Sequence, residues 1–188
     1  MKILFAAFLC ITSLCMGNEN MELLISQEEI AQKIEQTAQK LEAEYHGEEL
    51  TLVMVMKGAV CIAVDLMREL KLSTDLEYIK ASSYGLNGDQ RGELTITGLE
   101  RLQLKGKNVL LIDDIFDSGA TMEKIVSQLS EKQPKSLKSL VLLMKNVPHA
   151  TDYRPDYVLF DIEDRFVIGY GLDFKEKYRN LKGVYAFK

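Results

Sequence analysis

The sequence predicts an α/β domain, with a mainly parallel β-sheet flanked by helices. Three observations lead to this prediction. Apolar runs without polar alternation recur along the chain, as expected for strands that are buried on both faces of a helix-covered sheet. Segments with apolar residues at helical spacing lie between these runs, and short polar loops connect the two kinds of element. Such alternation produces parallel strands joined by right-handed crossovers.

Length and composition fit one domain with a full core. The chain has 188 residues, of which 47% are apolar and 27% charged, and this excludes a disordered or fibrous protein. A formal net charge of −5 argues against an extended surface for nucleic acid, although a local basic patch can still hold one small polyanion. Neither a P-loop motif nor the dinucleotide-binding G-x-G-x-x-G occurs in the sequence.

Residues 1–20 differ from the rest of the chain. Lys2 is followed by about fourteen largely apolar residues, fewer than the ~20 that a membrane-spanning helix needs. We interpret this segment as an over-long start, with translation beginning at Met21; a leader or anchor is the alternative. Without the segment Cys61 is the only cysteine, as expected for a protein of the reducing cytoplasm.

The first regular elements are a helix, a strand and a second helix. Ser26 and Glu29 match the capping-box pattern S-x-x-E, and apolar residues at helical spacing predict an amphipathic helix from about 27 to 45. The apolar run Leu50–Met56 predicts a buried strand, and Ala59–Met67 predicts the helix that follows it.

Polar loops follow this strand and the next one. Lys57 and Gly58 come directly after the first strand, so a cation and a glycine lie at its carboxyl end. The next strand is predicted at Leu76–Ala81, and a glycine-rich loop over 82–92 follows it. Leu94–Ile96 is predicted to pair back as a short strand.

The stretch Val109–Met122 (VLLIDDIFDSGATM) contains the strongest functional pattern. Its apolar run Val109–Ile112 predicts a strand that ends at Asp113 and Asp114. Ligands of open α/β sheets bind at the carboxyl ends of the strands. Neighbouring carboxylates there can accept hydrogen bonds from a vicinal diol or face a hydrated cation.

A turn of small residues follows the acids and leads into a predicted helix at Thr121–Leu129. Gly119 permits positive φ, and uncovered N–H groups at a helix start can wrap an anion. A diol site beside a phosphate cradle describes a pocket for ribose 5-phosphate. The turn comprises Asp117, Ser118, Gly119, Ala120 and Thr121.

This order of strand, acids and small-residue turn closely resembles the phosphoribosyl-pyrophosphate signature of the type I phosphoribosyltransferases. Over nearly all of 21–188 the chain is similar to the hypoxanthine-guanine branch of that family. The further segments that carry the resemblance are Lys57-Gly58, Ser83-Tyr84, Lys145 after the predicted strand Ser139–Met144, and Phe166–Asp173 with Arg179 after the predicted strand Tyr157–Ile162.

The resemblance implies one phosphoribosyltransferase domain over 21–188, of type I fold, with a small hood formed largely by the C-terminal segment. It also implies a reaction in which ribose 5-phosphate passes from 5-phosphoribosyl 1-pyrophosphate to hypoxanthine or guanine, with Mg²⁺ as cofactor and pyrophosphate as the second product. In this branch a cis peptide precedes the loop lysine, here the bond Met56-Lys57.

Site residues are likewise implied by the resemblance. Those for the sugar and its phosphates are Asp113 and Asp114 for the ribose hydroxyls and the metal, Asp173 for the metal, Lys57, Gly58 and Arg179 for pyrophosphate, and Ser118, Gly119, Ala120 and Thr121 for the 5′-phosphate. Those for the base are Asp117 as general acid/base beside N7, Lys145 as donor to the 6-oxo group, Phe166 as stacking platform, Val167 through its backbone, and Ser83 and Tyr84 in a loop that closes over the site.

Several alternatives remain open. The enzyme could prefer xanthine or another base, although adenine, orotate and uracil enzymes should lack the combination of Lys145, Phe166 and Asp173. Phe166 could instead be a core residue. A non-catalytic nucleotide-sensing regulator on the same fold should show a basic face, which a pI of about 5.2 does not favour. We expect small-molecule partners, no nucleic acid or membrane, and a dimer or tetramer of identical chains.

Overall fold

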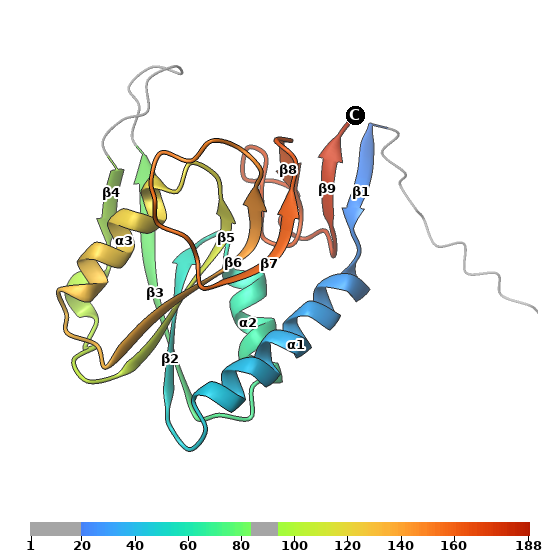
Figure 1. Ribbon diagram of the computed structural model, residues 1–188. Helices are drawn as coiled ribbons and strands as arrows, with labels where there is room; N and C mark the ends of the chain where they lie inside the picture. Colours follow the sequence, from blue (N-terminus) through green and yellow to red (C-terminus); the bar gives the residue numbers. More distant parts are fainter. Residues whose placement is uncertain (1–19, 84–93) are drawn as a thin grey trace, which may run out of the picture.

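The computed structural model describes residues 20–83 and 94–188 (Figure 1). The elements of its main sheet are β2 (Leu50–Met56), β3 (Thr74–Ser83), β4 (Leu94–Thr97) with the 3-10 turn η1 (Leu99–Arg101) after it, β5 (Asn108–Phe116), β6 (Ser136–Lys145) and β7 (Tyr157–Ile162). The strand order is β4-β3-β2-β5-β6-β7. All neighbours are parallel except β3 and β4. The predicted mainly parallel sheet is therefore confirmed.

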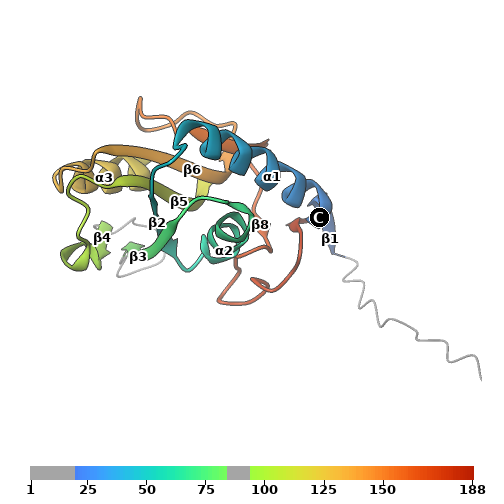
Figure 2. The ribbon, with the colours of Figure 1, turned by 90° about the horizontal axis from the view of Figure 1, so that it is seen from below.

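Helices cover both faces of this sheet. α1 (Gln27–Glu44) and α2 (Val60–Glu69) lie side by side on one face, and α3 (Ala120–Ser130) packs on the other (Figure 1, Figure 2). The predicted capping box of α1 is confirmed. Ser26 Oγ accepts a hydrogen bond from the Glu29 N–H at 3.2 Å, and Glu29 Oε2 accepts one from the Ser26 N–H at 2.8 Å.

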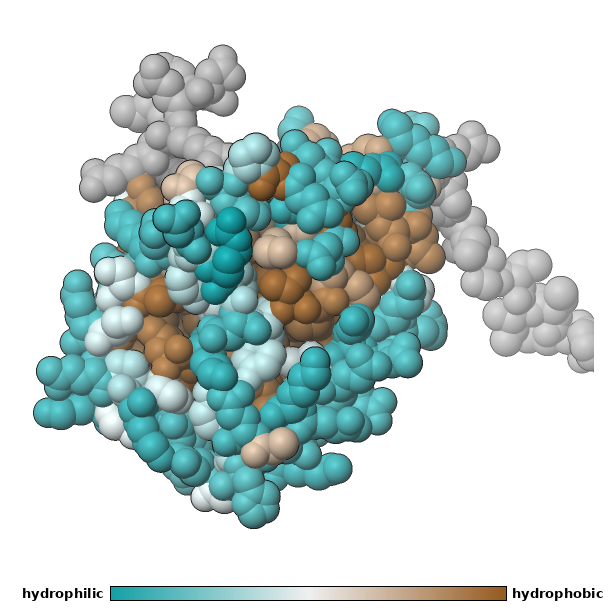
Figure 3. All heavy atoms as spheres, in the orientation of Figure 1, coloured by the Kyte–Doolittle hydropathy of each residue, from teal (hydrophilic) through white to brown (hydrophobic). Residues whose placement is uncertain are grey.

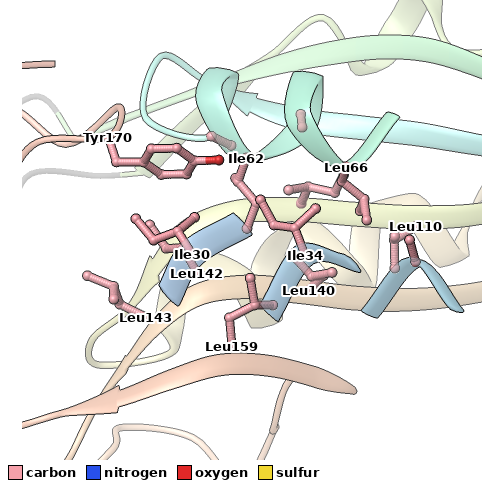
Figure 4. Close-up of a cluster of buried hydrophobic side chains, with 14 of the residues drawn as sticks. Ile30, Ile34, Ile62, Leu66, Leu110, Leu140, Leu142, Leu143, Leu159 and Tyr170 are labelled. Atoms are coloured by element: carbon pink, nitrogen blue, oxygen red, sulfur yellow. The ribbon is translucent and has the colours of Figure 1, made fainter. Parts of the chain in front are cut away.

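The two faces of the sheet build two hydrophobic cores, because successive side chains of a strand point to opposite sides. Leu110 of β5 packs towards α1 and α2, whereas the next residue, Leu111, packs towards α3. Figure 4 shows the first core, in which Leu110 lies near Ile34 of α1 and Leu66 of α2. Burial of one such side chain contributes about 1.5–3 kcal/mol.

A second, three-stranded antiparallel sheet forms the hood. It contains β1 (Met21–Ile25), β8 (Val167–Ile168) and β9 (Val184–Phe187), in the order β1-β9-β8 (Figure 1). The hood is thus formed largely by the C-terminal segment, as predicted, but β1 was not foreseen. Tyr170 joins the hood to α2, since its hydroxyl donates a hydrogen bond to Asp65 Oδ2 at 2.7 Å.

The strand in the signature stretch is longer than predicted. We expected the apolar run Val109–Ile112 to form it, with Asp113 and Asp114 at its carboxyl end, but β5 continues to Phe116, so both acids lie within the strand. The reason is the neighbouring strand β6, which keeps pairing with β5 through Ile115↔Leu143 and Phe116↔Met144. The turn therefore begins only at Asp117.

The surface drawn in Figure 3 is largely hydrophilic, with apolar side chains gathered beside the hood strands. Leu23 of β1 is one of the exposed large apolar residues. Within residues 20–83 and 94–188, no helix combines the length and the apolarity that crossing a membrane requires.

Candidate active site

A cavity of about 550 Å³ opens at the carboxyl ends of β2 and β5, beside the start of α3. This is the edge of the sheet at which the sequence predicted a ligand site. Most of the predicted residues meet there: the cavity is lined by Lys57, Gly58, Asp113, Asp114, Asp117, Ser118, Gly119, Ala120, Thr121, Asp173 and Arg179.

The paired acids are among the residues that line this cavity. Asp113 is buried, and its Oδ1 accepts a hydrogen bond from the Asp114 N–H at 2.9 Å. Burial raises the pKa of both carboxyls, and for Asp113 the neighbouring charge of Asp114 raises the pKa further. For Asp114 the nearby Arg179 partly opposes the increase. A hydroxyl donor or a cation would stabilise the charged forms of these carboxyls.

Gly58 allows the loop after β2 to approach the acids closely. A Cβ atom at this position would lie 1.6 Å from Asp114 Oδ2, so a side chain here would displace the carboxylate. The peptide bond Met56-Lys57 in the same loop is cis, as the resemblance implied.

The small-residue turn forms a concave backbone segment at the start of α3. Gly119 has φ +84°, and a Cβ there would lie 2.4 Å from Thr151 Cγ2 and 2.6 Å from Phe116 Cζ. Only glycine therefore fits without displacement of its neighbours. The N-cap residue Gly119 makes no side-chain cap hydrogen bond at this helix start, and the turn lines the cavity. The turn comprising Asp117, Ser118, Gly119, Ala120 and Thr121 thus has the geometry of an anion cradle.

Two residues that the sequence analysis missed anchor this turn. The ring nitrogen His149 Nδ1 forms a hydrogen bond with the Asp117 carbonyl at 2.7 Å, and the Ala150 N–H donates to the Ser118 carbonyl at 2.8 Å. Both lie in the loop after β6, about thirty positions from their partners. Their sequence carries no local pattern that predicts this contact.

The two cationic side chains that line the cavity come from the loop after β2 and from the segment between β8 and β9, and we call them its cationic end. Arg179 Nη2 lies 2.7 Å from Asp173 Oδ1, and Arg179 Nη1 donates to the Gly171 carbonyl at 2.7 Å. Lys57 Nζ lies 2.9 Å from Glu176 Oε2, and the same oxygen lies 3.3 Å from Arg179 Nη2. Glu176 was not among the predicted site residues. The only feature of the sequence that could have indicated this contact is the presence of an acidic residue between Asp173 and Arg179.

Of the residues predicted for the base, Asp117 lines the cavity, whereas Lys145, Phe166 and Val167 are not among its lining residues. Lys145 Nζ lies 3.9 Å from Asp117 Oδ2 and 3.0 Å from Asp164 Oδ1, so Lys145 and Asp117 are neighbours. Val167 is buried in β8. Ser83 is the last residue of β3, but its side chain and the whole of Tyr84 lie outside the described residues.

Phe166 is 56% exposed and therefore is not a core residue, which answers the alternative left open by the sequence. One face of its ring packs on Phe187, with centroids 6.1 Å apart and an interplanar angle of 24°. Phe174 contacts its edge at 5.6 Å. Phe166 is thus an aromatic surface held in place by the hood.

No preformed metal cage of three or more His, Cys, Asp or Glu side chains occurs among the described residues. Asp113, Asp114 and Asp173 line the same cavity, but both oxygens of Asp173 already have partners, Arg179 and the Glu176 N–H. These carboxylates could supply one or two ligands to a hard cation such as Mg²⁺, whose other ligands in phosphate sites are water and substrate oxygens.

Comparisons with known proteins agree with this geometry. The model of the "Phosphoribosyl transferase domain" family matches residues 22–175. The chain is 37% identical over 168 residues to the hypoxanthine-guanine phosphoribosyltransferase of Aquifex aeolicus, covering 89% of this chain and 94% of the relative. It is 34% identical over 167 residues to the enzyme of the same name from Bacillus subtilis, covering 89% and 93%.

Solved structures show the same similarity. A hypoxanthine-guanine phosphoribosyltransferase of Bacillus anthracis matches with a TM-score of 0.83 and 35% identity, covering 89% of this chain and 98% of the other. The hypoxanthine phosphoribosyltransferase of Trypanosoma cruzi, solved in complex with the product IMP, matches with a TM-score of 0.80 and 31% identity, covering 88% and 93%.

Proposed function

From the premise that this chain belongs to the phosphoribosyltransferase family, in its hypoxanthine-guanine branch, we propose how its cleft carries out the reaction. The protein is a pentosyltransferase of purine salvage. Ribose 5-phosphate passes from 5-phosphoribosyl 1-pyrophosphate to a ring nitrogen of hypoxanthine or guanine, and pyrophosphate leaves. The observation that carries the proposal is one cavity whose lining combines paired acids, a small-residue turn at a helix start and a pair of cations.

The sugar phosphate binds between the acids and the cradle. Asp113 and Asp114 accept hydrogen bonds from the two ribose hydroxyls, and these bonds favour the charged forms of two carboxyls whose pKa burial raises. The N–H groups and hydroxyls of the turn bind the 5′-phosphate. This contact requires Gly119, whose positive φ opens the cradle.

Pyrophosphate binds at the cationic end. Arg179 can hold a phosphate through two parallel hydrogen bonds, and Lys57 adds a second positive charge. Gly58 lets the backbone of this loop come close to the leaving group. Negative charge accumulates here as the bond to the sugar breaks, so this end stabilises the transition state as well as the substrate.

Mg²⁺ belongs to the proposal as a cofactor held mainly by the substrate. When bound, it neutralises part of the charge of the leaving pyrophosphate. Asp173 is the first candidate for a direct contact, and Asp113 and Asp114 act directly or through water. The support is chemical: these three carboxylates line the cavity that also contains the residues assigned to the phosphates.

The purine lies on the exposed face of Phe166, next to Lys145 and Asp117. Lys145 donates a hydrogen bond to the 6-oxo group, and Asp117 exchanges the proton of N7. The 3.9 Å between Lys145 Nζ and Asp117 Oδ2 supports this arrangement, since neighbouring edge atoms of one purine could reach both. The Val167 backbone contacts the base edge. Ser83 and Tyr84 belong to the loop that closes over the site and excludes water.

A nucleobase survey tests the reaction. Purified protein receives 5-phosphoribosyl 1-pyrophosphate, Mg²⁺ and, in separate assays, hypoxanthine, guanine, xanthine, adenine, orotate or uracil, and both nucleotide and pyrophosphate are measured. We expect turnover with hypoxanthine and guanine. Adenine should fail because its 6-amino group offers a donor where Lys145 offers another. Nucleotide formed only from adenine or a pyrimidine would overturn the base assignment.

The remaining parts of the proposal concern location and assembly. We propose a cytoplasmic homo-oligomer, a dimer or tetramer, whose partners are small molecules and not nucleic acid or membrane. Size-exclusion chromatography with light scattering measures the assembly. Filter binding of RNA and DNA at low and physiological salt tests the regulator alternative, and we expect no retention at physiological salt.

A further inference from the structure

Glu176 occupies an unusual position for an exposed acid. It belongs to the segment Asp173–Arg179 between β8 and β9, and its side chain contacts Lys57 in the loop after β2. One carboxylate oxygen, Oε2, lies 2.9 Å from Lys57 Nζ and 3.3 Å from Arg179 Nη2. These are the two side chains to which the proposed function assigns pyrophosphate.

The contact has the geometry of a phosphate oxygen between two cations. An oxygen about 2.7–2.9 Å from a cationic nitrogen makes a charge-assisted hydrogen bond, whether the oxygen belongs to a carboxylate or a phosphate. The contact with Lys57 has this length, whereas the contact with Arg179, at 3.3 Å, is longer. Lys57 and Arg179 cannot direct the same N–H groups at Glu176 and at pyrophosphate simultaneously. The two anions therefore compete.

The backbone holds Glu176 in this position. Lys175 has φ +52° and Glu176 has φ +63°, a left-handed conformation that is uncommon for residues other than glycine. The Glu176 N–H donates to Asp173 Oδ2 at 2.8 Å. Phe174 and Lys177 close the turn with reciprocal backbone hydrogen bonds of 3.1 Å. Positive φ at both central residues is what a two-residue type I′ hairpin turn requires, so the turn fixes the backbone at Glu176.

We propose that the Glu176 carboxylate is an internal competitor of pyrophosphate: it orients Lys57 and Arg179 and yields them when the pyrophosphate group of the substrate enters. The proposal rests on the function proposed above. Displacement is feasible because the side chains of Lys57 and Glu176 are 54% and 65% exposed, and exposed ion pairs are weak. Glu176 is thus a positioning residue that sets affinity at one end of the cleft.

Calorimetric titration with inorganic pyrophosphate, in buffer with Mg²⁺, tests the proposal. The proteins are the natural chain, Glu176→Gln and Glu176→Ala, with Glu35→Gln as matched control. Glu35 lies on the exposed face of α1, so its replacement removes the same charge at a distance from the cleft. We expect about two- to fivefold tighter binding for both Glu176 variants and no change for the control.

A titration with IMP separates competition from a general structural effect. The 5′-phosphate of IMP is assigned to the backbone cradle, so its affinity should stay within about twofold in Glu176→Gln. Pyrophosphate affinity in Glu176→Gln that equals or falls below that of the natural chain would overturn the competition, and so would an equal gain in Glu35→Gln. If neither pyrophosphate nor IMP binds to the natural chain or to any variant, the result would instead overturn the function on which the proposal rests.

Discussion

The turn and the cationic end of the cleft are suited to anions by different physical means. At one end the turn Asp117–Thr121 offers backbone N–H groups, whose positions are fixed by Gly119 and by the start of α3. At the other end Lys57 and Arg179 offer long, charged side chains that are already paired with Asp173 and Glu176. The first end is preorganised, whereas the second must exchange partners.

This difference suggests a division of labour. A preorganised cradle suits the 5′-phosphate, which stays on the sugar throughout the reaction and needs a fixed position. A cationic end balanced by its own acids suits pyrophosphate, which must bind as part of a substrate and then leave as a product. We therefore expect substitutions at the cradle to act on positioning, and substitutions at the cationic end to act on affinity.

The largest expected effect is at the cradle. Gly119→Ala should lower kcat/KM for 5-phosphoribosyl 1-pyrophosphate by about a hundredfold, because the new Cβ collides with Thr151 and Phe116 and shifts the N–H groups by an amount that catalysis does not tolerate. Steady-state kinetics measures the loss. Gly106→Ala is the matched control: its φ is +73°, but a Cβ there has no neighbour within 4 Å. An equal loss in both variants would show that backbone strain, not the cradle, causes it.

Asp117→Asn should lower kcat by at least about tenfold, a loss of ~1.4 kcal/mol of transition-state stabilisation. Asp117 contributes its carbonyl to the anchoring of the cradle through His149, and asparagine keeps that backbone contact. The variant therefore removes the proton-transfer group and leaves the anion site intact. Rapid-quench and steady-state kinetics check the rate, and circular dichroism checks the fold. Near-normal turnover would remove Asp117 from the mechanism.

Phe166→Leu tests whether the base site is independent of both anion ends. We expect KM for hypoxanthine to rise by about fivefold, since a stacked base contributes ~1–3 kcal/mol and leucine keeps only part of the contact. KM for 5-phosphoribosyl 1-pyrophosphate should not change. A rise in KM for 5-phosphoribosyl 1-pyrophosphate alone would contradict the assignment of Phe166 to the base.

The smallest expected effect is a change in thermal stability, and it comes from the paired acids Asp113 and Asp114. Burial and the charge of Asp114 raise the pKa of Asp113 well above its ordinary value of 3.8. Because the folded protein binds this proton more tightly than the unfolded chain does, the protonated Asp113 carboxyl contributes to the stability of the fold. This contribution is fully present below about pH 3.8 and is lost as the pH rises through the pKa of the folded state. Asp113→Asn stays neutral, so it should raise Tm by about 2–5 °C at pH 7–8 while activity falls.

Calorimetric scans at several pH values measure this effect. The difference in Tm between Asp113→Asn and the natural chain should shrink as the pH falls towards 4, where the natural carboxyl is also protonated. A difference that grows on acidification would have the opposite sign and would contradict the raised pKa.

Local patterns predicted the preorganised end of the cleft better than the exchangeable end. The turn Asp117–Thr121, the capping box of α1 and the apolar strands depend on neighbouring residues, so they were predictable from the sequence. The contact between Lys57 and Glu176 joins residues 119 positions apart, and it arises only when the hood folds over the sheet. No periodic pattern in the sequence predicts such a contact.

Pairing between distant segments explains the other differences. Met21–Ile25 becomes a strand because it pairs with Val184–Phe187 near the other end of the chain. β5 extends through Asp113 and Asp114 because β6 continues beside it. In both cases a partner strand supplies the hydrogen bonds that decide the conformation, and the segment itself contains no sufficient signal.

A crystal structure with IMP, pyrophosphate and Mg²⁺ tests the central claim most directly. We expect the 5′-phosphate on the N–H groups of the turn Asp117–Thr121, the ribose hydroxyls on Asp113 and Asp114, and pyrophosphate between Lys57 and Arg179, with Glu176 turned away. A nucleotide bound instead in the groove between α1 and α2, lined by Ile34 and Cys61, or a phosphate that leaves the cradle empty, would contradict the account.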